Sequence, residues 1–533
     1  MDNGASWISI IPPVLAIILV ISTKKVLLSL GAGVVSAAFI VADYNPLETL
    51  SLVWGAFAGI FWADGAVNTY YVYILVFTLM LGMIAALILM AGGSAAFSEW
   101  AVQRIRSRRG AQALAGILGV VIFIDDYFNA LAVGQVARPV TDRHRVARAK
   151  LAYLIDSTSA PVAVLAPFSS WGASIIGIMA PIVAASTLAV SDVEAFIVAA
   201  GMNYYASGAL IMVALVIFFQ LDVGPMRAEE ERALVHGETY DDSLDIPGKL
   251  AEDLPVHEPG AKRALVVPFL ALVLGVLGGI VYTGYTGADE PSWSPLDILA
   301  NTDVTAALIF GGVLGMTSAL YSYWRYTSAN PRFGVSTLGR GLLEGIRSMA
   351  PAVYILLLAW MLGSLISELG TGDYLGGLVE QADIPPEWLI PVMFVMAGAM
   401  AFSTGTSWGS FGILLPIAGD IMNSVGEPDL LLPAMGAVLA GAVFGDHCSP
   451  ISDTTILSST GASCNVITHV TTQLPYAITG AVGALTGYVV FSLTQNGLLG
   501  FAAMVVTLVA LALGAKAMVP TLEDKVAKER SVA

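Results

Sequence analysis

Acidic residues inside strongly apolar sequence are the first feature that could carry out chemistry. Asp125 and Asp126 lie side by side in FIDDYFNALAVG (123–134), and basic clusters flank this stretch at 104–109 and 138–150. A charge at membrane depth costs about 2.5–3.5 kcal/mol on insertion scales, so such acids are functional-site candidates by default. The pair therefore predicts a buried site that binds a proton or a small cation.

Three further acids belong to two related strings. Asp156 opens DSTSAPVAVLAPFSSWGAS (156–174), while Asp446 opens DHCSPISDTTILSSTGAS (446–463), which also contains Asp453. Proline removes a backbone donor and breaks a helix, so each string predicts a discontinuous helix. The freed carbonyls, hydroxyls and carboxylates are hard oxygen ligands of the kind that small cations prefer.

The two strings also indicate an internal repeat. Six of the 14 positions that start at Pro161 and at Pro450 are identical, at a fixed offset of 289. Each string follows an apolar stretch, at 112–136 and at 388–422, that is interrupted by polar residues. A hairpin followed by a broken helix, occurring twice, is typical of the repeats from which many secondary transporters are built.

We expect five carboxylates to bind a cation or a proton in turn: Asp125, Asp126, Asp156, Asp446 and Asp453. Neutral polar groups near them should support the site: Asn129, Ser157, Ser169, Ser170, Thr406, Ser407, Ser449, Ser452 and Thr454. His447 could sense pH, because an unperturbed histidine titrates near neutrality. A histidine that is hydrogen-bonded at the helix break is an equally open interpretation.

The overall composition predicts an all-α polytopic membrane protein. Of the 533 residues, 56% are hydrophobic and only 12% are charged, with mean hydropathy +0.78. A soluble domain carries about 25% charged residues. Apolar runs near the length needed to cross a bilayer occupy 7–21, 26–42, 70–90, 204–220, 264–282, 304–320, 350–366, 473–492 and 501–513.

The basic residues predict the topology, because Lys and Arg mark cytoplasmic loops. The N-terminus is expected outside, with the C-terminus and the linker at 222–263 in the cytoplasm. The stretch 112–136 is flanked by basic clusters on both sides, so it should be a re-entrant hairpin that enters from the cytoplasm. The stretch 388–422 is flanked by segments without Lys or Arg, so it should enter from outside. This predicts two inverted-topology repeats, each with a re-entrant hairpin and a Pro-broken discontinuous helix.

The expected segments run as follows: N-terminal transmembrane helices at 1–103; the first repeat core at 104–221, with hairpin 112–136 and broken helix 150–177; an acidic cytoplasmic linker at 222–263; further helices at 264–385; the second repeat core at 386–472, with hairpin 388–422 and broken helix 429–468; and C-terminal helices and a tail at 473–533. The linker holds 11 acidic and 5 basic residues. Few apolar residues predict a solvated, partly disordered connector there, while the placement of 50–63 is left open.

Three strings together resemble the NhaC family of Na⁺/H⁺ antiporters, a part of the ion-transporter superfamily: FIDDYFNALAVG, RPVTDRHRVARAKLAYLIDSTSAPVAVLAPFSSWGA and FGDHCSPISDTTILSS. The resemblance implies a secondary antiporter that exchanges Na⁺ for H⁺ at carboxylates that bind them competitively. It makes Asp156, Asp446 and Asp453 the expected Na⁺ ligands. Replacing Asp156 or Asp446 by Asn should then abolish exchange and leave folding intact.

Other function classes fit the sequence less well. Some members of the family exchange organic solutes, so the alternative is a Na⁺- or H⁺-coupled exchanger of the malate/lactate or arginine/ornithine type. We expect no Lys or Arg inside the spans, which favours a cation over an anion. The G-x₄-G-K-[ST] motif of ATP-driven pumps is absent from the sequence. A transporter rather than an enzyme is expected, with no cofactor beyond the transported ions and no nucleic-acid partner.

The cellular setting is also an expectation. The net charge of −16 suits a high-salt cytoplasm, which fits a prokaryotic halophile such as a haloarchaeon. Na⁺/H⁺ exchange in its cytoplasmic membrane would serve pH homeostasis. The lipid bilayer is the expected surrounding, and a homodimer is left open.

Overall fold

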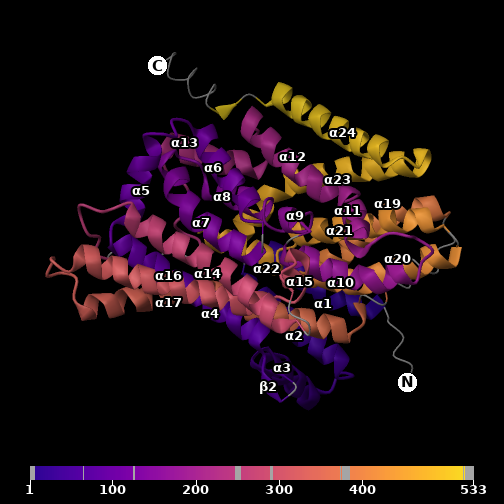
Figure 1. Cartoon of the computed structure of the whole chain (residues 1–533), viewed down its shortest axis with the longest axis horizontal. Helices are drawn as coiled ribbons and strands as arrows, with labels where there is room; N and C mark the ends of the chain where they lie inside the picture. The colour runs from indigo at the N-terminus through magenta and orange to yellow at the C-terminus, as the bar shows by residue number, and fades with distance from the viewer. Residues whose placement is uncertain are drawn as a thin grey trace.

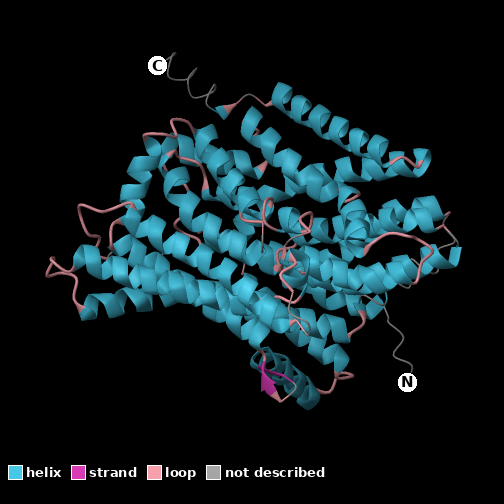
Figure 2. Cartoon of the chain, in the orientation of Figure 1, coloured by secondary structure: helices cyan, strands magenta, loops and turns pink. Residues whose placement is uncertain are grey.

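The protein folds into a helical bundle, which was obtained as a computed structural model (Figure 2). The structure describes residues 7–23, 25–63, 65–123, 126–167, 169–246, 254–288, 292–371, 374, 385–425, 427–519 and 521–522. At some positions inside helices, Ser170 and Asp420 among them, only the backbone is described. Within these residues one antiparallel strand pair, β1 (Trp62–Ala63) with β2 (Ala66–Val67), interrupts the helices.

The first half of the chain contains η1 (Trp7–Ile10), α1 (Ile11–Thr23), α2 (Val26–Val41), α3 (Pro46–Phe61), α4 (Thr69–Met90), α5 (Gly93–Val102), α6 (Arg108–Val121), α7 (Asp126–Arg143), α8 (Arg148–Asp156), α9 (Ala160–Ala163), α10 (Ser170–Ala184), α11 (Asp192–Gly201), α12 (Tyr204–Phe219) and α13 (Pro225–His236).

The second half contains α14 (Arg263–Gly287), α15 (Pro295–Ala300), α16 (Val304–Thr327), α17 (Val335–Glu368), α19 (Pro386–Thr404), α20 (Ser407–Val425), η2 (Pro428–Leu430), α21 (Leu431–Cys448), α22 (Asp453–Ala462), α23 (Val466–Thr494) and α24 (Gly497–Met518).

Within the described residues, seven helices are long and apolar enough to cross a bilayer, and α11 with α12 forms an eighth span if that bent pair is counted. The prediction of a multi-pass helical membrane protein is therefore confirmed. The apolar runs at 7–21 and 26–42 form helices of 13 and 16 residues, α1 and α2. Both are shorter than a full crossing of about 20 residues.

Two flanking groups of helices enclose a central group (Figure 1). Helices α4, α14, α16 and α17 pack together on one flank, while α12, α23 and α24 pack on the other. The short helices α8 and α22 lie between the flanks, where α22 contacts both α7 and α8. The broken parts of the chain are thus surrounded by continuous helices, which is where interrupted backbone can survive in a membrane protein.

Each half contains a helix pair joined by a short break. Helices α6 and α7 contact each other across residues 122–125, and α19 and α20 contact each other across Gly405 and Thr406. Gly405 ends α19 with φ +73, and a side chain there would also meet Ile451. Both breaks fall inside the expected hairpins. The side of the membrane from which each pair enters, and hence the inverted repeat, stays a prediction.

Each half also contains an interrupted helix where the sequence places a Ser-Pro string. The first runs through α8, α9 and α10, with breaks at 157–159 and 164–169, and the second through α21 and α22, with a break at 449–452. Ser169 and Ser452 accept bonds from backbone N–H groups as the N-caps of α10 and α22. The serines next to the breaks therefore start the second helical segments.

Helices from the two halves meet at a pair of glycines. A Cβ atom on Gly134 of α7 would lie 2.3 Å from the backbone of Gly461 in α22, and a Cβ on Gly461 would lie 2.2 Å from the carbonyl oxygen of Ala130. Small residues allow such close backbone approach in membrane bundles. A side chain at either position would push α7 and α22 apart.

The acidic linker differs from its prediction. Residues 225–236 form α13, and its Glu230 is fully buried in an ion pair with Arg108 of α6. Asp222 forms a second buried ion pair with Lys150 of α8. Breaking one partner of a buried pair leaves an uncompensated charge, which destabilises a protein strongly. The interpretation as a solvated connector is therefore wrong for this part of the linker.

Candidate functional site

Asp156 is the last residue of α8, and four donor groups surround its buried carboxylate. Ser458 of α22 donates to Oδ1 at 3.1 Å. Gln473 of α23 donates to Oδ2 at 2.6 Å, with His469 Nε2 at 3.2 Å from the same oxygen and His447 Nε2 at 3.7 Å. An acid at a helix C-terminus is disfavoured by the helix dipole, and these groups offset that cost.

His447 occupies the centre of the same network. Its Nε2 lies 3.1 Å from Ser157 Oγ, and its Nδ1 lies 2.7 Å from the Tyr205 hydroxyl. Its backbone carbonyl accepts a bond from Gln473 at 2.6 Å. Since hydroxyls can donate or accept, either ring tautomer is satisfied here. The geometry matches a hydrogen-bonded histidine at the helix break, and its role as a pH sensor stays a prediction.

Asp446 has the same position in the second half but a different environment. It lies in the last turn of α21 and is 2% exposed. Ser407 of α20 donates to its Oδ2 at 2.9 Å, while its buried Oδ1 has no hydrogen-bond partner among the described residues. A carboxylate oxygen that has left water without a partner is costly. A proton or a cation on Oδ1 would remove this cost.

Asp453 is close enough to Asp446 for the two charges to interact. It is the first residue of α22, where the helix dipole favours an acid. Its Oδ2 accepts from the Tyr127 hydroxyl of α7 at 2.5 Å, and its Oδ1 accepts from the backbone N–H of Thr454 at 2.8 Å. Asp453 therefore has a hydrogen-bond donor at each carboxylate oxygen, whereas Asp446 lacks one at Oδ1 among the described residues.

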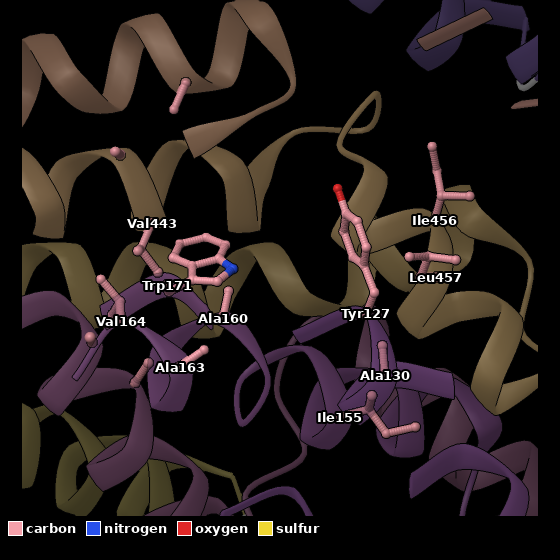
Figure 3. Packing of buried hydrophobic residues seen from close by; sticks show 14 of the residues in the cluster. Tyr127, Ala130, Ile155, Ala160, Ala163, Val164, Trp171, Val443, Ile456 and Leu457 are labelled. Atoms are coloured by element: carbon pink, nitrogen blue, oxygen red, sulfur yellow. The ribbon is translucent and has the colours of Figure 1, made fainter. Parts of the chain in front are cut away.

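Asp126 is held at the start of α7 by a tryptophan. The Trp171 indole donates to Asp126 Oδ1 at 2.9 Å, and its ring centroid lies 5.0 Å from that of Trp408 in α20. Figure 3 shows the Trp171 ring beside Val443, while the Tyr127 side chain projects from α7. The neighbouring Asp125 lies outside the described residues.

Several of the expected supporting groups bind the backbone. Ser169 donates to the Ala163 carbonyl at 2.6 Å, and Ser449 donates to the Phe402 carbonyl at 2.8 Å. The Asn129 amide donates to three carbonyls: Gly119 at 2.6 Å, Ile122 at 2.8 Å and Thr158 at 3.2 Å. Thr406 accepts from the Trp408 N–H at 3.3 Å. These groups hold the breaks in place, and the Ser170 side chain is not described.

Two other hydroxyls are better placed for an ion. Ser452 Oγ, in the break between α21 and α22, lies 2.9 Å from Thr454 Oγ1 in the first turn of α22, and Asp453 stands between them in the sequence. Ser407 is already bonded to Asp446. Together with carbonyls freed at the breaks, these groups form an oxygen-rich environment around the two acids. Hard cations such as Na⁺ suit such a donor set.

Several contacts of the site residues were not predicted from the sequence, among them those of His469 and Trp171. Ser458, Gln473, Tyr127 and Tyr205 all hydrogen-bond to predicted site residues. Gln473 had a usable signal, because it follows His469 by four positions and so lies on the same face of α23. Tyr205 stands in an ordinary apolar run, where nothing in the local sequence distinguishes it.

A cavity of about 590 Å³ approaches Asp453 from the ends of α3, α4 and α17. Its lining includes Tyr71 and Trp360, whose rings lie 4.7 Å apart, and the carboxylate of Glu368. Both aromatic side chains lie close enough to Asp453 to interact with its carboxylate. Tyr71 and Trp360 therefore belong both to the lining of this cavity and to the surroundings of Asp453.

A membrane bundle with buried acids at broken helices is the arrangement of a secondary transporter. The profile of the Na⁺/H⁺ antiporter family matches residues 162–493. The chain belongs to this family, and it is a transporter of the antiporter type rather than an enzyme.

Individual relatives agree with this assignment. An uncharacterized protein of Haemophilus influenzae is 43% identical over 97% of this chain and 96% of its own length. The malate-2H⁺/Na⁺-lactate antiporter of Bacillus subtilis is 32% identical over 29% of this chain and 34% of its own. An uncharacterized Na⁺/H⁺ antiporter of H. influenzae is 32% identical over 29% of this chain and 32% of its own.

Proposed function

We propose that the chain exchanges Na⁺ for H⁺ across the cytoplasmic membrane by alternating access, with Asp446 and Asp453 binding the two ions competitively. One observation carries the proposal: Oδ1 of Asp446 is buried beside a second carboxylate and has no hydrogen-bond partner in the part of the chain that the structure describes. Two like charges in a poorly solvated site disfavour each other. One proton or one Na⁺ relieves this repulsion, and the binding of either ion opposes the binding of the other.

The remaining expected groups have distinct parts in this proposal. Ser407, Ser452 and Thr454 would complete the ligand set with neutral oxygens. Asp156 would act alongside the pair as an acid already occupied by protein donors, linking α8 of the first half to α22 and α23 of the second. Asp126 and Asn129 would fix the tip of the first hairpin.

The proposed orientation follows the distribution of Lys and Arg. The N-terminus lies outside, and the C-terminus and linker lie in the cytoplasm. The α6–α7 pair is re-entrant from the cytoplasm and the α19–α20 pair from outside. Protons then move inward down their gradient while Na⁺ leaves the cell. The cavity at Tyr71 and Trp360 would be the approach from the outer side.

The test is proton flux in proteoliposomes that contain the full chain and hold an acid-inside pH gradient. NaCl, KCl and LiCl are added in separate runs without any organic solute, and an internal dye reports the pH. We expect Na⁺ to collapse the gradient in vesicles with protein and not in empty vesicles. No response to any of the three cations would contradict cation/proton exchange.

The same vesicles test the second candidate, a coupled organic-acid exchanger. The named B. subtilis relative favours this candidate, because its name specifies malate and lactate. Malate or lactate is added where Na⁺ alone gives no flux. Gradient collapse that requires the organic acid would assign the chain to this second class.

A further inference from the structure

A separate cavity of about 320 Å³ lies between α7, the end of α22 and the flank that contains α4 and α14. Its walls come from α4, α5, α7 and α14, from the end of α22 and from the linker. None of its lining residues belongs to the networks around Asp156, Asp446 or Asp453. Ligand pockets typically occupy about 300–1,000 Å³, so this cavity is large enough for a small molecule.

The charges that line this cavity do not balance. The described lining holds two guanidinium groups, Arg138 and Arg148, and one carboxylate, Asp142. Arg148 binds Asp142 through two nitrogens, at 3.1 and 3.3 Å. Arg138 donates to the Ser463 hydroxyl and forms no ion pair with a described residue. The two guanidinium groups therefore share one carboxylate, which leaves a net positive charge among the described lining residues.

Arg138 also corrects an expectation from the sequence. The predicted hairpin ended at residue 136, which placed Arg138 in a loop and left the apolar stretch without a basic residue. The structure continues α7 to Arg143, so Arg138 lies within the helix and lines an internal cavity. Helix α7 thus carries a basic residue beside the cavity, although we expected no Lys or Arg inside the spans.

The second guanidinium is held rigidly. Arg148 stacks on the Tyr240 ring, with its central carbon 3.8 Å from the ring centroid, and its Nη1 reaches the Ser463 carbonyl at 3.4 Å. Its backbone N–H donates to the Thr239 carbonyl at 2.8 Å. The linker thus supplies one wall of the cavity and fixes Arg148, while Arg138 retains hydrogen-bond donors for a ligand.

The opposite walls are apolar. Ala85, Ile88 and Leu89 of α4 and Leu265 and Phe269 of α14 line the cavity facing the arginines. A bare inorganic anion gains nothing from such walls, whereas a carbon skeleton does. A guanidinium fork matches a carboxylate in geometry, because two parallel N–H groups meet two oxygens.

We propose that this cavity binds a small organic carboxylate, with Arg138 as the charge partner and the α4 and α14 side chains covering the carbon skeleton. The bound molecule would contact both α7, which carries Tyr127, and the flank formed by α4 and α14. The site is distinct from the ion site, and its test measures binding without transport. The Arg138 and Ala85 variants separate this site from a transport site for an organic acid.

The test is calorimetric titration of the purified full chain in detergent, in Na⁺-free buffer of constant ionic strength. The probes are the potassium salts of succinate, lactate, phosphate and chloride. We expect saturable binding of succinate or lactate, at least about tenfold tighter than phosphate or chloride, because the apolar walls cover a carbon skeleton that the two inorganic anions lack. Equal binding of all four anions, or no saturable binding, would overturn the proposal.

Two variants locate the binding. Arg138→Gln retains a donor for Ser463 and removes the charge, so succinate affinity should fall about tenfold or more. Ala85→Phe keeps both arginines and fills the cavity from α4, so it should block binding by volume alone. The matched control is Arg347→Gln, since Arg347 is exposed and pairs with Glu344.

The variants also separate binding from folding. Each should melt cooperatively in detergent before it is titrated, and Ala85→Phe provides the answer if Arg138→Gln does not fold. Loss of succinate binding in the folded cavity variants, with binding retained in Arg347→Gln, would support the site. Unchanged succinate affinity in a folded cavity variant would refute it.

Discussion

Asp156 and Asp446 occupy corresponding places in the two halves, each in the last turn of a helix before a Ser-Pro break. Asp156 is surrounded by Ser458, Gln473 and two histidines, whereas Asp446 accepts a bond from Ser407 at Oδ2 and has no partner for Oδ1 among the described residues. The helix dipole disfavours both acids to a similar extent. The difference therefore lies in their neighbours, which come from other parts of the chain.

Because of this difference, we expect the two acids to have different roles. A carboxylate with several protein donors gains little from an additional cation, and it ties distant helices together. A carboxylate with one free buried oxygen gains much from a proton or Na⁺. The comparison changes the expectation from the sequence, where Asp156 and Asp446 had equal roles.

The largest effect is expected for Asp446→Asn. A neutral amide cannot take up and release a charge, so Na⁺-driven proton flux should fall on the order of 100-fold or more. The melting temperature in detergent should not fall, because the substitution removes a buried charge with one donor. The flux assay in proteoliposomes measures the first effect, and a thermal melt measures the second. Flux at the parent rate would remove Asp446 from the ion site.

Asp156→Asn should act mainly on stability. The substitution places an N–H donor where a carboxylate oxygen accepted a hydrogen bond. Two donors then face each other, and one of them stays buried without an acceptor, at a cost of about 1–3 kcal/mol. We expect a clearly lower melting temperature than for Asp446→Asn. If Asp156→Asn instead melts like the parent while losing all flux, the two acids have equal roles after all.

Ser407→Ala removes the hydroxyl that donates to Oδ2 of Asp446. Hydrogen bonds to charged groups contribute about 1.5–3 kcal/mol, and the same hydroxyl is an expected Na⁺ ligand. The Na⁺ concentration for half-maximal flux should therefore rise about tenfold, with little change in melting temperature. A titration of the flux with NaCl measures this shift. An unchanged half-maximal concentration would place Ser407 outside the ligand set.

Ser458→Ala is the matched variant on the other acid, and the smallest effect is expected here. Asp156 keeps Gln473 and its histidine neighbours, so the loss should be about 0.5–1.5 kcal/mol of stability. The half-maximal Na⁺ concentration should stay at the parent value. A large shift in that concentration would show that the network around Asp156 also takes part in Na⁺ binding.

The sequence predicted local features well. Proline and serine act on their own neighbourhood, so the breaks after Asp156 and Asp446 could be placed to within a few residues. Burial of the acids followed from the apolar sequence around them. Asp125 lies outside the described residues, and the orientation of the two hairpins stays a prediction.

Contacts between distant segments could not be predicted in this way. Tyr127 and Asp453 are 326 positions apart, and Arg108 and Glu230 are 122 apart. The linker could not be predicted from composition alone. Its acidic residues predict a solvated surface, but Arg108 and Lys150 pair with two of them in the folded chain, and the sequence does not show that these residues come together.

The bond between Asp156 and Ser458 has a consequence for how the protein is made. The two residues are 302 positions apart, so at typical translation rates of about 5–20 residues per second, Ser458 is synthesised roughly 15–60 s after Asp156. Gln473 and both histidines arrive later than Asp156 by a similar interval. The first half must therefore wait at the membrane with an acid whose partners do not yet exist. The first half can therefore complete its fold only after the ribosome has synthesised the partners of Asp156 in the second half.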